Sequence, residues 1–213
     1  EYNTQYAAHI LGYVRAMDSE QAAEYMSGTD SGYDLNDKVG QSGVELAFED
    51  WLHGVNGTAS VTSTADGTIT STVYTEEPEP GNHVYLTIDV QLQEAVERAL
   101  EFGIYELQLD RDDDNRERVA NGEEPEEDVG GGAIVVVDVD TGEPLAIASY
   151  PTYSLVTLED DYEELSTDEE NTPLFNRALQ GTYAPGSTFK PLMALAGLTE
   201  GFVNTETQIV CNG

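Results

Sequence analysis

A serine and a lysine three positions apart could carry out nucleophilic acyl transfer. Ser187 and Lys190 stand in the segment Pro185-Gly186-Ser187-Thr188-Phe189-Lys190-Pro191. In the first turn of a helix, residues three apart share one face, so their side chains can meet. A serine hydroxyl becomes a good nucleophile when a neighbouring base takes its proton, and a lysine does this only while its amine is neutral. Burial and the positive end of a helix dipole both favour the neutral amine.

The pair must stand at the beginning of a helix for this chemistry to work. Pro191 is compatible with a first helical turn, where the backbone donors need no intrahelical partner. We therefore predict an apolar helix from about Ser187 to Leu198. Arg177, ten positions before the nucleophile, is better suited to an ion pair or a backbone clamp that fixes the loop leading into the active helix than to contact with a substrate.

The region before this helix has the pattern of an α+β domain. Val84 to Ile88 alternates as a strand does, and Asp89 is placed to cap a helix. The apolar positions of that helix have helical spacing and are Leu92, Ala95, Val96, Ala99 and Leu100. Residues 133–139 and 143–149 flank the turn Asp140-Thr141-Gly142, which predicts a hairpin.

The first 80 residues read as a separate small module. Helical spacing occurs at Val44, Phe48, Trp51 and Leu52. Residues 58–75 are rich in Thr, Ser and Val around a turn at 65–68, which predicts a second hairpin. The run Glu76-Glu77-Pro78-Glu79-Pro80-Gly81 then interrupts regular structure, so we predict one module over 1–80 and another over 81–213.

Charge and composition exclude several functions. The 213 residues contain 42 acidic against 8 basic side chains, for a net charge of −34. Nucleic acid and anionic lipid are therefore poor partners. Much of the acid lies at 76–79, 110–128 and 159–170, which we predict to be solvated loops. No stretch is apolar enough for a membrane span, and the single Cys211 excludes a disulfide within the chain.

The sequence predicts no metal site and no cofactor. Asp110-Arg111-Asp112-Asp113-Asp114-Asn115 begins like a calcium loop, but Asn115 occupies its glycine position and Asn121 its final glutamate position. The histidines His9, His53 and His83 have no second ligand at helical spacing, so surface or packing roles are favoured over metal binding.

The frame around the nucleophile resembles a known family. The run Asn176-Arg177-Ala178-Leu179-Gln180-Gly181-Thr182-Tyr183-Ala184-Pro185-Gly186-Ser187-Thr188-Phe189-Lys190-Pro191 closely resembles the active-serine segment of the class B penicillin-binding proteins. The resemblance continues through Tyr85 to Asp89 and through Val135 to Asp138, in family order. Val39 to Glu45 is similar to the end of that family's non-catalytic pedestal. The resemblance covers nearly the whole chain.

This resemblance implies a fold, an activity and partners. The fold would be α+β, with the C-terminal part of a pedestal, or dimerisation-type, module followed by the N-terminal part of a transpeptidase domain like that of serine β-lactamases. Ser187 would be acylated by the penultimate D-alanine of a peptidoglycan stem peptide ending in D-Ala-D-Ala, or by a β-lactam. Lys190 would move its proton. Asn176-Arg177-Ala178 with Gly181 and Tyr183 favours the elongation type over the division type.

The resemblance also implies a cellular setting. The parent protein would stand at the outer face of the bacterial cytoplasmic membrane, held by a single-pass anchor that this chain lacks. Its pedestal would contact a membrane glycan polymerase. The family's later motifs are absent, since no serine is followed two places on by Asn and neither Lys38 nor Lys190 begins a Lys-Thr/Ser-Gly. We therefore expect a truncated piece that is inactive alone.

Two alternatives stay open at this point. A β-lactam receptor or a serine β-lactamase would share the Ser-x-x-Lys helix, although the pedestal-like residues 39–57 count against both. A non-catalytic module that docks onto the glycan polymerase is the alternative from a different class.

Overall fold

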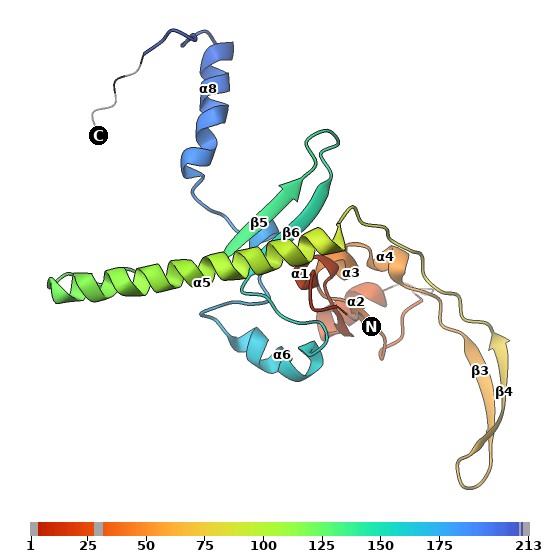
Figure 1. The fold of residues 1–213 in the computed structure, drawn as a ribbon. Helices are drawn as coiled ribbons and strands as arrows, with labels where there is room; N and C mark the ends of the chain where they lie inside the picture. The colour runs from red at the N-terminus through yellow and green to blue at the C-terminus, as the bar shows by residue number, and fades with distance from the viewer. Residues whose placement is uncertain (1–3, 28–31, 209, 211–213) are drawn as a thin grey trace. The chain divides into compact units, whose positions relative to one another are not determined.

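The computed structural model describes residues 4–27, 32–208 and 210. The chain divides into two compact units, Glu1–Gln180 and Gly181–Gly213 (Figure 1). Cys211 lies outside the described residues. In the described part of the first unit the strands form two-stranded antiparallel sheets, which are separated along the chain by helices.

Short elements make up the start of the first unit. They are α1 Ala8–Leu11, β1 Val14–Ala16, α2 Ser19–Tyr25, β2 Lys38–Gly40, α3 Gly43–Ala47 and α4 Glu49–Leu52. β1 and β2 pair antiparallel, with Val14 opposite Gly40. Asp18 caps α2 through a capping box with Gln21. The helical spacing predicted at 44–52 is thus divided between two short helices, α3 and α4.

A close backbone crossing fixes this region. Gly12 and Gly43 have φ values of +78° and +59°, which glycine adopts without steric cost. A Cβ added to Gly12 would lie 1.8 Å from the carbonyl oxygen of Ser42, so no side chain fits there. The residues after α1 and those before α3 can approach this closely because both positions lack a side chain.

The hairpin predicted at residues 58–75 is confirmed. β3 Thr58–Ser63 pairs antiparallel with β4 Ile69–Glu76. Gly67 has a φ of +88°, and the backbone N–H of Thr64 donates to Thr68 O at 2.9 Å to close the turn. Every residue of both strands is exposed.

The long helix α5 Val90–Ala120 packs on the second hairpin. As predicted, Asp89 caps it, because its carboxylate accepts from the backbone N–H groups of Gln91 and Leu92 at 2.9 and 3.0 Å. The main core of the unit combines apolar residues of α5 with small residues of β6, namely Val96, Leu100, Ile104, Ala146 and Ala148.

The predicted apolar face of α5 is partly wrong. Ala95 and Ala99 are exposed, whereas Gln93 is fully buried and faces the hairpin. The side-chain amide of Gln93 hydrogen-bonds the backbone of Ile147 as an adjacent strand would. It accepts from the N–H of Ile147 at 2.8 Å and donates to the carbonyl of Ile147 at 2.7 Å. A paired amide can be buried where an unpaired one could not, so the apolar pattern did not show which face is buried.

We predicted a loop over the acidic segment 110–128. This prediction is wrong for its first part, because α5 continues through residue 120. Arg111, Arg116 and Arg118 pair with Glu126, Asp113 and Glu123, respectively, which offsets part of the charge repulsion. After the helix ends at Ala120, Gly122 has a φ of +81° and closes a Schellman motif in which the N–H of Glu123 donates to Arg118 O at 2.9 Å.

The hairpin predicted around residues 140–142 is confirmed. β5 Gly132–Val137 pairs antiparallel with β6 Pro144–Tyr150. Asp138 stabilises the turn by accepting from the backbone N–H groups of Asp140 and Thr141 at 2.8 and 2.9 Å. The prediction of a strand at residues 84–88 is wrong, because this segment has no strand pairing, although the following Asp89 donates its N–H to Leu145 O.

The acidic segment at 159–170 is also helical over most of its length, where we predicted a loop. α6 Leu158–Thr167 has an apolar side at Leu158, Tyr162 and Leu165 that packs around Ala8 and Tyr153. The short α7 Arg177–Gln180 closes the first unit. Helices and two-stranded antiparallel sheets follow one another along the unit. None of the described helices has the length and apolarity that crossing a bilayer requires.

Candidate active site

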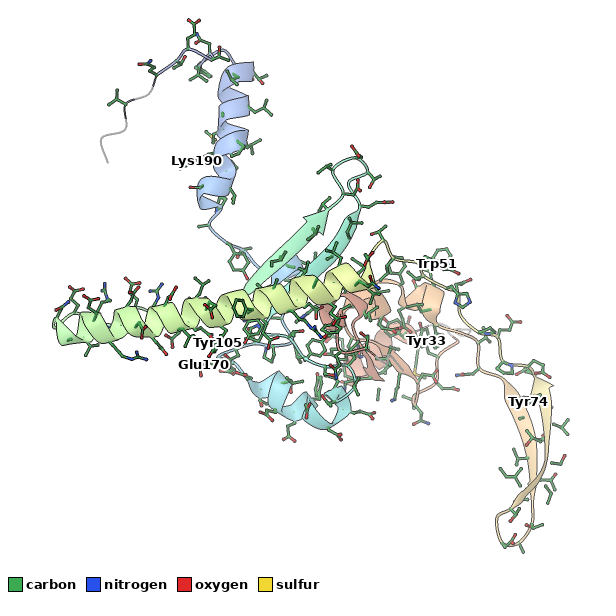
Figure 2. All side chains as sticks on the ribbon, in the orientation of Figure 1. Tyr33, Trp51, Tyr74, Tyr105, Glu170 and Lys190 are labelled. Carbon is green, nitrogen blue, oxygen red and sulfur yellow. The ribbon has the colours of Figure 1, made fainter. Side chains whose placement is uncertain are left out.

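The second unit contains the predicted nucleophile and base. A 3₁₀ turn, η1 Gly186–Phe189, leads directly into α8 Lys190–Thr199. The predicted helix from about Ser187 is therefore confirmed, with its first turn wound more tightly than an α-helix. Residues three apart eclipse one another in such a turn, so Ser187 and Lys190 stand on one face. Figure 2 labels Lys190 at the beginning of α8.

Local chemistry explains where this helix begins and ends. Gly186 has a φ of +53°, and Thr188 donates its N–H to Pro185 O at 3.2 Å. Pro191 lies in the first turn, where its missing N–H costs nothing. At the other end Gly201 has a φ of +74° and Phe202 donates to Gly197 O at 3.0 Å, which is a Schellman motif.

Ser187 and Lys190 are both exposed. Within residues 181–208 and 210, the structure gives no hydrogen bond between Ser187 Oγ and Lys190 Nζ. The apolar side chains of α8 are also uncovered, and Leu195 is 62% exposed. The described segment thus supplies the spacing and the positive helix end, but not the burial that would favour a neutral amine.

Arg177 fastens the end of the first unit. Its guanidinium donates to Thr172 O at 3.1 Å, to Thr172 Oγ1 at 2.9 Å and to Asn171 O at 2.5 Å. Arg177 is thus a backbone clamp, as predicted, but these contacts hold the backbone at residues 171–172 and not the loop that leads into the serine helix. Thr172 has a φ of +43°, which is an unusual conformation for a β-branched residue, so the clamp holds a strained turn.

Asn176 makes structural contacts that sequence reasoning missed. Its Oδ1 accepts the N–H of Leu179 at 3.1 Å, which caps α7, and also accepts Ser149 Oγ at 3.3 Å. Its Nδ2 donates to the carbonyl of His9 at 3.1 Å. Asn176 stands just before α7, where asparagine commonly caps a helix. This position was the one feature of the sequence that could have predicted its role.

His9 has the packing role that the sequence favoured. Its side chain is buried, and its Nε2 lies 2.8 Å from Pro173 O. Its ring meets that of Tyr153 edge-on, with the centroids 5.0 Å apart. Burial lowers the pKa of His9 below its ordinary value of 6.5, the hydrogen bond to Pro173 opposes that shift, and the charge of Arg177 adds to it.

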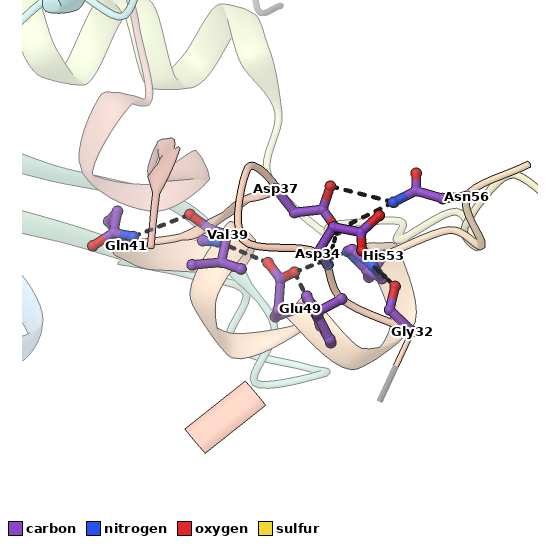
Figure 3. A network of polar contacts seen from close by, with 10 residues as sticks. Gly32, Asp34, Asp37, Val39, Gln41, Glu49, His53 and Asn56 are labelled. Carbon is purple, nitrogen blue, oxygen red and sulfur yellow. Dashed lines mark hydrogen bonds and ion pairs between the residues drawn. The ribbon is translucent and has the colours of Figure 1, made fainter. Parts of the chain in front are cut away.

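His53 belongs to a polar network around the buried Glu49 (Figure 3). Its Nδ1 lies 3.4 Å from Glu49 Oε1, and its ring stacks on Tyr33 with the centroids 3.9 Å apart. Glu49 also accepts the N–H of Gly40 at 2.7 Å. Burial and the charge of Glu49 raise the pKa of Tyr33. The network ties α4 to β2, whereas His83 is exposed.

Two family models match the chain. The penicillin-binding protein dimerisation domain matches residues 1–86, and the penicillin-binding protein transpeptidase domain matches residues 132–213. The second match includes Ser187 and Lys190. The order of the two matches and the α+β architecture confirm the predicted fold class, a pedestal module followed by the beginning of a transpeptidase domain. The chain belongs to the class B penicillin-binding proteins.

Individual relatives sharpen this assignment. The chain is 34% identical to the peptidoglycan D,D-transpeptidase MrdA of Acinetobacter baumannii over 95% of its length, and 30% identical to MrdA of Escherichia coli over 94%. It spans 26% and 28% of these two relatives, respectively. The chain is therefore similar to about a quarter of each relative.

Solved structures agree with this result. A chain from a structure that describes the coordination of polymerization and crosslinking by a peptidoglycan synthase complex superposes with a TM-score of 0.76 at 34% identity. The match covers 98% of this chain and 34% of that one. Penicillin-binding protein 2X of Streptococcus thermophilus superposes with a TM-score of 0.55 at 20% identity, which shows a common fold alone.

Proposed function

We propose that the complete protein is a serine-type peptidoglycan D,D-transpeptidase of the elongation type. The observation that carries the proposal is the placement of Ser187 and Lys190 on one face at the beginning of a helix, inside the part of the chain that matches a transpeptidase domain. The similarity to two MrdA proteins supports the same reaction and favours the elongation type.

In this reaction Ser187 Oγ attacks the carbonyl carbon of the penultimate D-alanine of a stem peptide. Lys190, as the neutral amine, takes the hydroxyl proton. The bond between that carbon and the amide nitrogen breaks, the terminal D-alanine leaves with a proton, and an ester forms on Ser187. An amine from a second stem peptide then attacks the ester, which releases Ser187 and forms the cross-link.

A β-lactam would react with the same serine. Ser187 Oγ attacks the lactam carbonyl and the ring C–N bond breaks, but the leaving nitrogen stays tethered to the acyl group. The ester then persists and blocks the site. The complete protein is therefore proposed as a β-lactam target, and the rapid hydrolysis that defines a β-lactamase is not expected.

The 213-residue chain by itself is proposed to be inactive. Ser187 and Lys190 are exposed, and the Ser-x-Asn and Lys-Thr/Ser-Gly motifs that line such a pocket are absent from its sequence. Electrostatic stabilisation of the developing oxyanion needs donors held in place around a water-poor site. The rest of a transpeptidase domain would pack against the exposed apolar side chains of α8 and so exclude water from the site.

We further propose the two-module division at residue 80 and the cellular setting of the complete protein. The pedestal, residues 1–80, would dock on a membrane glycan polymerase, which the similarity to a chain of a peptidoglycan synthase complex supports. The catalytic part would act at the outer face of the bacterial cytoplasmic membrane, held by a single-pass anchor.

Labelling with a fluorescent β-lactam tests the proposal. We expect the complete protein to form a stable adduct at Ser187, which mass spectrometry of peptides would locate. Ser187→Ala should abolish the adduct, and Lys190→Arg, which keeps the charge but cannot act as a neutral amine, should slow its formation roughly thousandfold. Ser60→Ala, at an exposed serine of β3, is the matched control and should label normally.

Two results would contradict the proposal. A complete protein that hydrolyses the drug quickly would be a β-lactamase. Specific labelling of the isolated 213-residue chain at Ser187, at the rate of the complete protein, would show that the absent motifs are unnecessary.

A further inference from the structure

The buried His9 connects two distant parts of the chain. It belongs to α1, within the region that matches the dimerisation domain, and its Nε2 contacts Pro173 O at 2.8 Å within the region that matches the transpeptidase domain. Its own carbonyl accepts Asn176 Nδ2 at 3.1 Å. One residue thus holds the backbone before α7 at two points, through its side chain and through its main chain.

The contacts of His9 assign its tautomer. A backbone carbonyl can only accept, so Nε2 must carry the proton that is donated to Pro173 O. The unprotonated Nδ1 then accepts from Thr152 Oγ1, which lies 3.4 Å away. The burial that lowers the pKa of His9 favours this neutral form. The ring is therefore a rigid link with a defined donor and a defined acceptor.

His9 contacts Pro173 in the same turn that the Arg177 side chain holds through Asn171 and Thr172. Residues 171–177 include Thr172 with its φ of +43° and the hydrogen bonds of Arg177 to Asn171 and Thr172. A turn in a sparsely populated backbone conformation persists only while its surroundings hold it there. Ser187 follows Arg177 by ten positions, so this turn lies shortly before the serine segment in the sequence.

We propose that His9 is a positioning residue for acyl transfer at Ser187, because it fixes the turn at residues 171–177 from which the serine segment leaves the first unit. This inference rests on the proposed function. His9 contacts neither the substrate nor the reacting atoms. Its side chain acts through Pro173, and loss of that contact would move the nucleophile away from the geometry that attack requires.

The test measures acylation of the complete protein by a fluorescent β-lactam as a function of drug concentration. This separates the rate constant at saturation from the half-saturating concentration. For His9→Ala we expect the saturating rate constant to fall roughly tenfold or more, with little change in the half-saturating concentration, because positioning affects the chemical step. His9→Gln, whose amide can still donate to Pro173 O, should restore most of the rate.

Two further variants separate positioning from general loss of stability. Tyr153→Phe removes the hydrogen bond of 3.1 Å from the Tyr153 hydroxyl to Ala8 O, beside His9, but leaves the links to Pro173 and Asn176 intact. It should acylate at the wild-type rate. Asn176→Asp keeps the acceptor that caps α7 and loses the donation to His9 O, so it should be slowed.

The outcomes are distinct. A wild-type saturating rate in His9→Ala, or a Tyr153→Phe variant slowed as much as His9→Ala, would overturn the inference and leave the proposed function standing. If His9→Ala does not fold by circular dichroism, the comparison passes to His9→Met, which fills the space without a donor to Pro173 O, against His9→Gln, and equal rates in these two would overturn it. Absence of any adduct in the wild-type protein would overturn the proposed function and this inference together.

Discussion

The two units differ in the sequence range of the contacts that fix their structure. In the first unit, residues 4–16 are tied by hydrogen bonds and ring contacts to partners more than 80 positions away, as in the bonds of Ala7 to Glu97 and of His9 to Pro173. In the second unit, the contacts that shape the serine helix are local, such as those of Thr188 with Pro185 and of Phe202 with Gly197.

This difference shows which features of the proposed site the 213 residues can assemble by themselves. Helix spacing brings Ser187 and Lys190 to one face from sequence proximity alone. The burial that tunes such a pair must come from distant parts of the chain. The first unit has such long-range packing, whereas the described part of the second unit leaves its apolar side chains in solvent.

Substitution of glycine should give the largest contrast between the units. Gly12→Ala should destabilise the chain by about 3–5 kcal/mol, because a Cβ there would collide with Ser42 O at 1.8 Å and φ is +78°. Gly186→Ala is the matched control, with a φ of +53° and no atom within 4 Å of its added Cβ, and should cost about 1 kcal/mol. Urea unfolding followed by circular dichroism measures both, and equal costs would contradict the contrast.

Truncation of leucines tests the packing of the two units directly. Leu100→Ala should cost about 2–4 kcal/mol, because Leu100 is 8% exposed between α5 and the β5–β6 hairpin. Leu195→Ala, at a position that is 62% exposed, should change the stability of the 213-residue chain by less than about 0.5 kcal/mol. The same thermal or urea unfolding in the complete protein should show a larger cost for Leu195→Ala. A large cost in the 213-residue chain would mean that α8 is already packed.

The hydrogen bonds of Arg177 to Asn171 and Thr172 should depend on arginine, and lysine should not replace it. Arg177→Lys should cost about 1–3 kcal/mol, because an ammonium cannot reproduce the planar set of donors that reaches Asn171 and Thr172. Arg98→Lys is the control at an exposed arginine and should change little. Amide hydrogen exchange of residues 171–180 measures the effect, and unchanged protection in Arg177→Lys would contradict the clamp.

The smallest predicted effect is a pH dependence of stability. Because burial lowers the pKa of His9 in the folded state from its ordinary value of 6.5, the unfolded chain binds the proton more readily. The contribution of His9 is therefore fully present above pH 6.5 and is lost as pH falls through the folded-state value. Urea unfolding at a series of pH values should show a shallower decline below pH 6.5 in His9→Gln than in the wild type, and an unchanged slope would contradict this prediction.

The sequence predicted the elements whose signals are local. The cap at Asp89, both hairpins and the helix after Pro185 rest on turn residues, caps and short-range periodicity. Two of the three acidic segments, 110–128 and 159–170, are helical over much of their length and were wrongly predicted as loops because charge was taken as a sign of irregular structure. Gly122, just after α5, was a usable signal for the first, and the spacing of Leu158, Tyr162 and Leu165 was a usable signal for the second.

The contacts that sequence reasoning missed are long-range polar ones. Gln93 is buried because Ile147, 54 positions later, pairs with its amide. Asn176 matters because its partner His9 lies 167 positions away. Apolar periodicity carries no information about such pairs, since a polar residue becomes suitable for burial only when its partner is in place.

The sequence by itself determined the family and the two residues proposed for chemistry, because Ser187 and Lys190 need only three positions of helix to meet. The tertiary structure alone decided that His9 and Asn176 join α1 to the turn before α7, and that α8 is uncovered in this chain. The physical reason is the range of the interactions. Helical spacing is fixed by neighbouring residues, whereas burial and hydrogen-bond partnership depend on which distant segments fold together.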